Sequence, residues 1–98
     1  MHAFTVQLTK QAAADLDTLP HDARLKVVKD ISTLTAHPLP EGKAKKKLKG
    51  FGFPLYRLRA GNYRVLYRID ARLVTIMRVI DRKDLEKIAR RLTLSRRH

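Results

Sequence analysis

The chain has 98 residues, a length that fits one domain with a modest core. Its 44% hydrophobic content excludes wholesale disorder, and the absence of cysteine excludes disulfides and thiolate metal sites. No apolar run approaches the ~20 residues of a membrane span, and the opening MHAFTVQLTK lacks the layout of a signal peptide. We therefore expect a cytoplasmic protein that does not enter membranes.

The net charge is +13, from 22 basic and 9 acidic residues, and it is unevenly distributed. Residues 1–40 are neutral, because they hold four basic and four acidic residues: Lys10, Arg24, Lys26, Lys29, Asp15, Asp17, Asp22 and Asp30. The whole excess therefore lies in residues 41–98. This asymmetry predicts a polyanionic partner, most commonly a nucleic acid. A basic surface that serves only solubility is the alternative.

The first forty residues predict a strand followed by two helices. Phe4, Val6 and Leu8 alternate with polar residues, which is typical of a strand. Thr9 is a good N-cap for a helix over residues 10–19. After Pro20, apolar residues at helical spacing predict a second helix that ends before two prolines: Leu25, Val27, Val28, Ile31, Leu34, then Pro38 and Pro40. The two helices are expected to form a hairpin.

The next segment predicts a basic loop and a β-hairpin. Residues 41–54, EGKAKKKLKGFGFP, combine lysines with glycines and a proline and are expected to form a loop. Alternating apolar residues predict strands over residues 56–60 and 63–69. Between them, Gly61 and Asn62 suit a two-residue turn, since glycine readily adopts a positive φ.

The C-terminal part predicts one more strand and a helix. The strand is expected over residues 73–80, and the helix is expected to begin near Arg82, followed by a frayed tail, SRRH. The helix has an apolar stripe formed by Leu85, Ile88, Ala89 and Leu92. The element order β-α-α-β-β-β-α predicts a single α+β domain over residues 1–98. Its helices are expected on one face of an antiparallel three-stranded sheet.

The hairpin also predicts a face rich in arginine. If Gly61 and Asn62 form the turn, Arg59 lies opposite Arg64. Strand alternation then puts four arginines on one face: Arg57, Arg59, Arg64 and Arg68. Like charges directly opposite each other destabilise a sheet, so the pairing favours a phosphate bound between the guanidiniums. The alternative is a solvated basic face with no ligand.

Several motifs carry a resemblance to a known family. They are KKLKG at 46–50, YRLRAGNYRVLYRI at 56–69, VTIMRV at 74–79 and DRKD at 81–84. On these motifs, and on the order of its elements, the chain resembles the RelE/ParE superfamily of toxins from type II toxin–antitoxin systems. The resemblance covers nearly the whole chain, and its most specific part is the pattern Y-R-x-R-x-G-x-Y-R-x-x-Y.

The resemblance implies an activity and partners. RelE-type members are ribonucleases that enter the ribosomal A site and cut messenger RNA. A 2′-hydroxyl attacks the adjacent phosphate, which leaves a cyclic phosphate and a 5′-hydroxyl without a metal or cofactor. The resemblance also implies an acidic antitoxin that wraps the toxin. The toxin alone is then expected to be a monomer, and with the antitoxin a hetero-oligomer.

The resemblance further implies roles for individual residues. Arg64 matches the arginine that clamps the scissile phosphate, Arg59 a basic strand residue at the cleft, and Arg82 a basic residue after the last core strand. These three are expected to be catalytic. The residues expected to bind RNA are Lys45, Lys46, Lys47, Lys49, Arg57 and Arg68.

The chain departs from the family at the proton-transfer group. RelE-type nucleases often carry a tyrosine or histidine near the C-terminal end of the site, and none stands there here. By alternation the three tyrosines, Tyr56, Tyr63 and Tyr67, are expected to face the core. Glu86 is the predicted catalytic carboxylate, and Asp81, Asp84 or a lysine of the 45–49 segment are alternatives.

The departure keeps two other functions open. One is a ParE-like inhibitor of DNA gyrase, and the other is an inactive protein that only binds the antitoxin. Two further points follow from the sequence. None of the four histidines has metal-ligand spacing to another, and Phe51 and Phe53 either stack on bases or hold the basic loop to the core.

Overall fold

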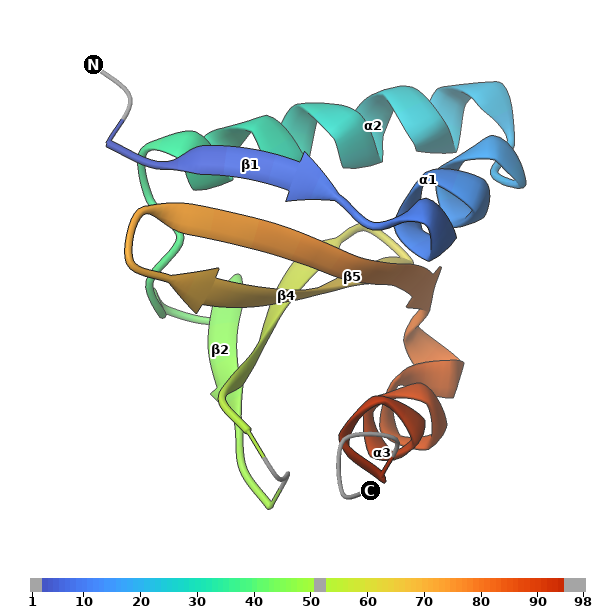
Figure 1. The fold of residues 1–98 in the computed structure, drawn as a ribbon. Coiled ribbons are helices and arrows are strands. Elements are labelled where there is room, and N and C mark those ends of the chain that lie inside the picture. The colour runs from blue at the N-terminus through green and yellow to red at the C-terminus, as the bar shows by residue number, and fades with distance from the viewer. Residues whose placement is uncertain (1–2, 51–52, 95–98) are drawn as a thin grey trace.

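The structure, a computed structural model, describes residues 3–50 and 53–94. Within these residues five strands form one sheet in the order β1-β5-β4-β3-β2 (Figure 1). The strands are β1 (Thr5–Leu8), β2 (Lys45–Leu48), β3 (Leu55–Ala60), β4 (Tyr63–Asp70) and β5 (Leu73–Asp81). The helices are α1 (Lys10–Asp17), α2 (His21–Ser32) and α3 (Leu85–Leu94), with 3₁₀ turns at Thr33–Thr35 and Arg82–Asp84. The predicted α+β class is confirmed.

The sheet differs from the prediction at both edges. β1 joins it parallel to β5, with Thr5 opposite Leu73, so the sheet is mixed rather than antiparallel. Lys45–Leu48, predicted as loop, forms strand β2 and pairs antiparallel with β3. Its sequence KKKL has no alternating apolar residues and so did not indicate a strand. An edge strand gains its hydrogen bonds from one neighbour and does not need such alternation.

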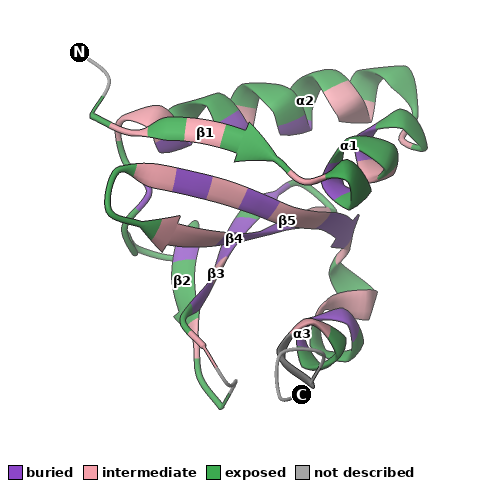
Figure 2. Ribbon diagram, in the orientation of Figure 1, coloured by how far each residue is buried: buried purple, intermediate pink, exposed green. Residues whose placement is uncertain are grey.

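The helices cover both faces of the sheet, and the prediction that they share one face was wrong (Figure 1). α1 and α2 pack over a core that includes Leu58, Val65 and Tyr67. α3 packs on the opposite face through two buried residues, Ile88 and Ala89. There it covers three apolar strand residues, Leu55, Leu66 and Ile80. The central strands are consequently buried on both sides (Figure 2).

The three tyrosines face the core beneath α1 and α2, which we call the first core, as predicted. Tyr67 is fully buried, and its hydroxyl donates a 2.6 Å hydrogen bond to the carbonyl of Pro38. Its ring stacks on Tyr56 with centroids 5.6 Å apart. Burial raises the pKa of the Tyr67 hydroxyl, which therefore stays a donor to the loop that follows α2.

One carboxylate fixes α1 to the sheet. Asp15 accepts hydrogen bonds from Arg78 Nε at 2.7 Å and Nη2 at 3.1 Å, and from the Val79 backbone N–H at 2.9 Å. The hydrogen bond from its guanidinium to Asp15 raises the pKa of Arg78, so this arginine stays charged. This contact sets the position of α1 against β5.

Two tight turns join the central strands. Gly61 has φ +61°, as the first central residue of a two-residue hairpin turn often does, and the predicted turn is confirmed. Ala71, in the turn between β4 and β5, has φ +53°, which strains a residue with a Cβ. No helix among the described residues is long and apolar enough to cross a membrane.

Candidate functional site

The hairpin register brings the arginines together as the sequence predicts. Arg59 lies opposite Arg64, and Arg57 lies opposite Leu66. Leu66 belongs to the core beneath α3, so its neighbours on this face of the hairpin point to the side of the sheet that carries α3. The predicted face is therefore confirmed for the arginines next to the turn.

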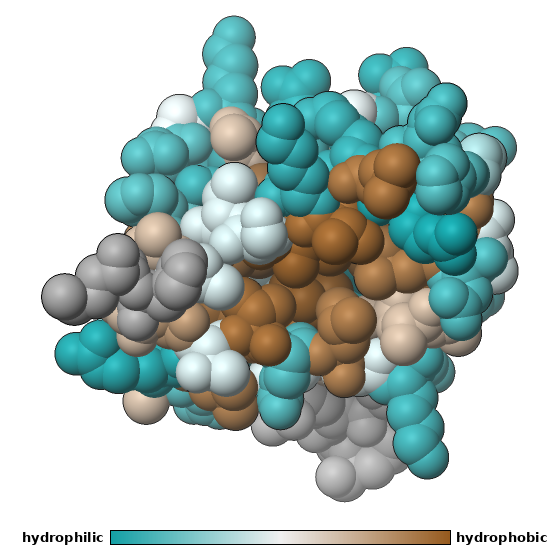
Figure 3. All heavy atoms as spheres, turned by 90° about the horizontal axis from the view of Figure 1, so that it is seen from above, coloured by the Kyte–Doolittle hydropathy of each residue, from teal (hydrophilic) through white to brown (hydrophobic). Residues whose placement is uncertain are grey.

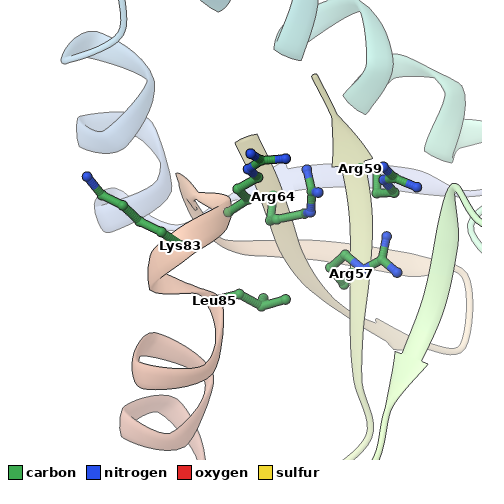
Figure 4. Close-up of a pocket in the computed structure, with 6 residues that line it drawn as sticks. Arg57, Arg59, Arg64, Lys83 and Leu85 are labelled. Atoms are coloured by element: carbon green, nitrogen blue, oxygen red, sulfur yellow. The ribbon is translucent and has the colours of Figure 1, made fainter. Parts of the chain in front are cut away.

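These arginines surround a cleft of about 440 Å³ at the turn end of β3 and β4 (Figure 4). Its described lining consists of Arg57, Arg59, Arg64, Arg82, Lys83 and Leu85, and we call it the arginine cleft. None of these lining residues is acidic. Leu85 points from the start of α3 toward the strands, whereas the end of Lys83 points away (Figure 4). The arrangement concentrates positive charge around a space open to a ligand.

Two of the guanidiniums are held by main-chain carbonyls. Arg57 Nη1 donates to the Lys43 carbonyl at 3.2 Å, and Arg64 Nη1 donates to the carbonyls of Gly61 at 2.9 Å and Tyr63 at 2.8 Å. Both residues are buried, with exposed fractions of 8% and 9%, while Arg59 is exposed. The buried pair therefore has fixed positions, and the exposed arginine can reach a ligand freely.

Burial and mutual repulsion lower the pKa of both buried arginines. For Arg57 the main cause is desolvation, followed by the charges of Arg64 and Arg59. For Arg64 it is again desolvation, followed by Arg59 and Arg82, with Asp81 acting in the opposite direction. Both groups stay charged at neutral pH, because an arginine starts from a very high pKa. A bound anion would relieve this repulsion.

The opposite wall of the cleft comes from the segment between β5 and α3. The Arg82 backbone N–H donates to the Asn62 carbonyl at 3.0 Å, which ties this segment to the hairpin turn. Asp81 accepts from the Lys83 backbone N–H at 3.0 Å and so caps the 3₁₀ turn. Lys83 and Leu85 were not predicted as site residues. Their position next to Arg82, at the start of the last helix, was the available signal.

The lysines of β2, all predicted to bind RNA, do not lie on one face of the sheet. Lys46 pairs with Arg57 and shares its face, whereas Lys45 and Lys47 pair with residues that face the first core. Lys45 is 6% exposed and lies 3.5 Å from the Glu41 carboxylate. Alternation along a strand separates neighbouring residues to opposite faces, and the predicted loop gave no reason to expect it.

Arg68 lies apart from the arginine cleft. Its guanidinium lies over the Phe53 ring, 4.5 Å from the centroid, and it is not a lining residue. Phe53 packs against the core beneath α3, so it holds the basic segment to the protein. Phe51 lies outside the described residues.

The predicted catalytic carboxylate is not among the described residues that line the arginine cleft. Glu86 is exposed on α3 and accepts a 2.9 Å hydrogen bond from Arg90 Nη2. Asp84 lies 3.9 Å from Lys87, also outside the described lining of the cleft. The described part of the chain contains no group of three or more His, Asp or Glu side chains suited to a metal ion. The described lining of the arginine cleft is thus cationic, and no carboxylate belongs to it.

Comparison with known proteins identifies the family. Residues 6–86 match the family described as the ParE toxin of the type II toxin–antitoxin system parDE. The chain belongs to this family. As a member, it is a toxin of a type II toxin–antitoxin system, and the resemblance found in the sequence is confirmed.

Individual relatives place the toxin close to RelE. It is 34% identical over 87 residues to the protein assigned as toxin RelE1 of Methanocaldococcus jannaschii, covering 86% of this chain and 96% of the relative. A chain of the archaeal RelE–RelB complex from Pyrococcus horikoshii is 30% identical, with a TM-score of 0.69 over 82% of this toxin and 96% of that chain. A chain of the RelBE2 toxin–antitoxin complex from Mycobacterium tuberculosis is 35% identical, with a TM-score of 0.70 over 82% and 99%.

Proposed function

We propose that this toxin is a metal-independent endoribonuclease that cuts messenger RNA in the ribosomal A site. The observation that carries the proposal is the arginine cleft. Four guanidiniums, from β3, β4 and the segment after β5, line one space that has no acidic residue in its described lining. A fold that needed only stability would not place Arg59 opposite Arg64, since opposed like charges destabilise a sheet.

The chemistry of RNA cleavage fits such a cleft. When a 2′-hydroxyl attacks the adjacent phosphorus, a base takes the proton of the 2′-hydroxyl, a P–O bond forms, and negative charge builds up on the phosphorane oxygens. The bond to the 5′-oxygen then breaks, and this oxygen takes up a proton to leave as a hydroxyl. Guanidiniums stabilise that charge with paired hydrogen bonds. In this proposal Arg59 and Arg82 contact the scissile phosphate from opposite walls, and Arg64, supported by Arg57, holds it from below.

The surroundings of the cleft extend the positive surface. Lys46 lies across from Arg57 on the same face, and exposed Lys49 follows at the end of β2. In the proposal both bind the RNA backbone next to the scissile phosphate. Lys45, Lys47 and Arg68 lie elsewhere and are not needed for this path.

The partner proposed to hold the toxin inactive is an acidic antitoxin. Two relatives of this chain have been solved in complexes named RelE–RelB and RelBE2. A net charge of +13, concentrated in residues 41–98, favours a partner of opposite charge. An acidic segment over the arginine cleft would exclude RNA by occupying the same guanidiniums.

The nuclease proposal is tested by mapping transcripts after induction of the toxin without its partner. We expect growth arrest and new 5′ ends within ribosome-bound messages, detected by primer extension. Arg59→Ala and Arg82→Ala should lose both effects. They are cleaner than changes at Arg64, whose guanidinium also holds main-chain carbonyls. Glu86→Gln is the matched control and should cleave normally.

A second candidate is a ParE-like inhibitor of DNA gyrase. Two observations favour it: the matching family is described as ParE toxin, and the described cleft lining lacks a carboxylate, tyrosine or histidine to move a proton. Inhibition of DNA supercoiling by the purified toxin, together with growth arrest that creates no new transcript ends, would replace the nuclease proposal with this one. Harmless overexpression would exclude both toxic activities.

A further inference from the structure

β5 contains a bulge near its middle. β4 and β5 pair so that Leu66 lies opposite Arg78 and Tyr67 lies opposite Ile76, which leaves Met77 as an extra residue in this pairing. An extra residue of this kind bends its strand and increases the local twist. We call residues 76–78 the β5 bulge.

The β5 bulge decides which side chains at the end of β5 face the arginine cleft. Before it, the even-numbered Ile76 belongs to the first core. After it, the odd-numbered Val79 belongs to the first core, and Ile80 belongs to the core beneath α3. Ile80 lies opposite Arg64, and two residues later the chain reaches Arg82 in the wall of the cleft. Without the extra residue, the end of β5 would turn its other face to the cleft.

α1 packs against β5 and forms hydrogen bonds with its main chain at the β5 bulge (Figure 1). Thr9 Oγ1 donates to the Met77 carbonyl at 3.0 Å. Further along the helix, Asp15 accepts from the Val79 N–H at 2.9 Å and from the Arg78 guanidinium at 2.7 and 3.1 Å. The carbonyl of the extra residue and an N–H two residues later are thus both bonded to α1.

These contacts also serve the helix itself. Thr9 and Asp15 are both partly buried. Thr9 Oγ1 accepts from the Ala12 N–H at 3.0 Å, so a single hydroxyl caps α1 and holds the β5 bulge. The bonds between Asp15 and the guanidinium are charge-assisted and therefore strong. A change in the shape of the bulge would consequently disturb the cap of α1 as well.

The pairing of β4 with β5 continues from the bulge to the cleft. Its last pair joins Asp81 to Tyr63, and the Arg82 N–H then donates to the Asn62 carbonyl at 3.0 Å. If the bulge moved from Met77 toward this end, each residue that it passed would shift by one position against β4 and turn to the other face. The register that the Arg82 hydrogen bond requires therefore depends on a bulge that stays in place.

We infer that α1 holds the β5 bulge in place and thereby positions Arg82 in the arginine cleft. Thr9 and Asp15 are then positioning residues for RNA cleavage, since neither belongs to the described lining of the cleft. The inference rests on the proposed nuclease function and adds the element that keeps one wall of the cleft aligned. Alignment matters because a misplacement of ~1 Å can slow a reaction by about 100-fold.

Amide hydrogen exchange tests this role of α1 without requiring activity. Asp15→Asn removes the charge that holds Arg78 and weakens the acceptor of the Val79 N–H. The Arg82 amide should then exchange at least about tenfold faster relative to the core amides of β3 and β4. Equal acceleration of all these amides would show that Asp15 only stabilises the fold, and would overturn the inference. Tyr67→Phe, which loses a hydrogen bond elsewhere in the first core, should give that equal acceleration.

A double-mutant cycle tests the effect on the reaction. The rate of cleavage of ribosome-bound messages is measured by primer extension at saturating toxin. Asp15→Asn should slow cleavage by about tenfold in the wild-type background and by less than about twofold in an Arg82→Lys background, because it acts through Arg82. Arg82→Lys is chosen because its charge supports residual cleavage. Equal slowing in both backgrounds would overturn the inference.

The controls come from the helical side of the molecule. Seen from above, this side shows hydrophilic side chains around a hydrophobic centre (Figure 3). The side chain of Asp17 on α1 is 82% exposed, so Asp17→Asn removes the same charge away from the β5 bulge. It should leave exchange and cleavage unchanged.

Thr9 provides an independent pair of variants in case Asp15→Asn does not fold. Thr9→Val loses the hydroxyl that bonds to Met77 and should repeat the effects expected for Asp15→Asn. Thr9→Ser keeps the hydroxyl and should behave as the wild type does. Equal behaviour of the two variants would overturn the inference.

The outcomes separate this inference from the proposed function. If the wild type cuts no message, the nuclease proposal fails, and exchange of the Arg82 amide still tests whether α1 positions this residue. If the wild type cuts, but the Arg82 amide follows the core amides in both Asp15→Asn and Thr9→Val, the positioning role is wrong while the nuclease proposal stands.

Discussion

Replacing Arg59 with glutamine should stabilise the toxin and weaken RNA binding at the same time. Arg59 is exposed and lies directly opposite Arg64 in the hairpin, so its removal relieves a like-charge pair. The gain should be ~0.5 kcal/mol in the free energy of unfolding, which corresponds to a rise of ~2–4 °C in the melting temperature of a chain this size. A gain in stability together with a loss of RNA binding would indicate that Arg59 serves binding and not the stability of the fold.

The loss of binding is measured best through its dependence on salt. Each phosphate neutralised on a single strand contributes about −0.7 to the slope of log affinity against log salt concentration. Arg59→Gln removes one cation from the arginine cleft and should therefore reduce the magnitude of this slope by about 0.7 relative to the slope of the wild type. Fluorescence anisotropy with a short single-stranded RNA across a salt series measures both values.

Lys29→Gln is the control for net charge. Lys29 is exposed on α2, on the other side of the sheet, so the variant removes one positive charge without touching the cleft. It should leave the slope unchanged. Equal slopes for Arg59→Gln and Lys29→Gln would show that RNA responds only to the total charge, and the reasoning about the cleft would then be refuted.

Three further changes test the fold. Tyr67→Phe loses the buried hydrogen bond to Pro38, so unfolding in urea should show a loss of ~1–2 kcal/mol. Because burial raises the pKa of Tyr67 in the folded chain, its contribution is complete below about pH 10, where the unfolded tyrosine begins to ionise, and is lost at higher pH; the wild type should therefore lose more stability above that pH than the variant does. Asp15→Asn weakens the contact with Arg78, and thermal unfolding should show a loss of ~2–3 kcal/mol. Ala71→Gly relieves the strain of a positive φ and should raise the free energy of unfolding by ~0.5–1 kcal/mol, measured by urea titration.

Local signals in the sequence were enough for the hairpin and its arginines. Alternation gave the faces of β3 and β4, and the Gly61-Asn62 turn gave the register, so the opposition of Arg59 and Arg64 followed from two residues. The apolar stripes gave α2 and α3. In each case the pattern and the final contact lie within a few residues of one another in the chain.

Contacts between distant segments were not predictable in the same way. The pairing of β1 with β5 joins residues almost seventy positions apart, and nothing in the short run of β1 specifies it. α3 packs on the face of the sheet that carries Leu66. In the sequence this leucine stands among arginines and breaks the alternation of apolar and basic residues, but in the fold it is part of the core beneath α3. Lys45, Lys46 and Lys47 point to alternating faces of the sheet because their segment pairs with β3 as an edge strand.

The predicted catalytic carboxylate illustrates a third limit. Glu86 lies close to Arg82 in sequence, but one helical turn carries it to the solvent side of α3, where it pairs with Arg90. The three arginines that the resemblance assigned, Arg59, Arg64 and Arg82, do line one cleft, because strand pairing fixes the positions of the first two. The resemblance offered no residue for proton transfer, because no tyrosine or histidine stands near the C-terminal end of the site in this sequence.

The hydrogen bond from the Arg82 N–H to the Asn62 carbonyl has a consequence for how this toxin loses its activity. Main-chain atoms set the distance between the two walls of the arginine cleft. This distance therefore depends on the number of residues in the β3–β4 turn and not on their side chains. Most single substitutions at Asn62 should therefore leave the toxin active. A one-residue insertion or deletion in the turn would move the two walls apart while every arginine remains. Cells that survive expression of the toxin should therefore often carry such changes in the length of the turn.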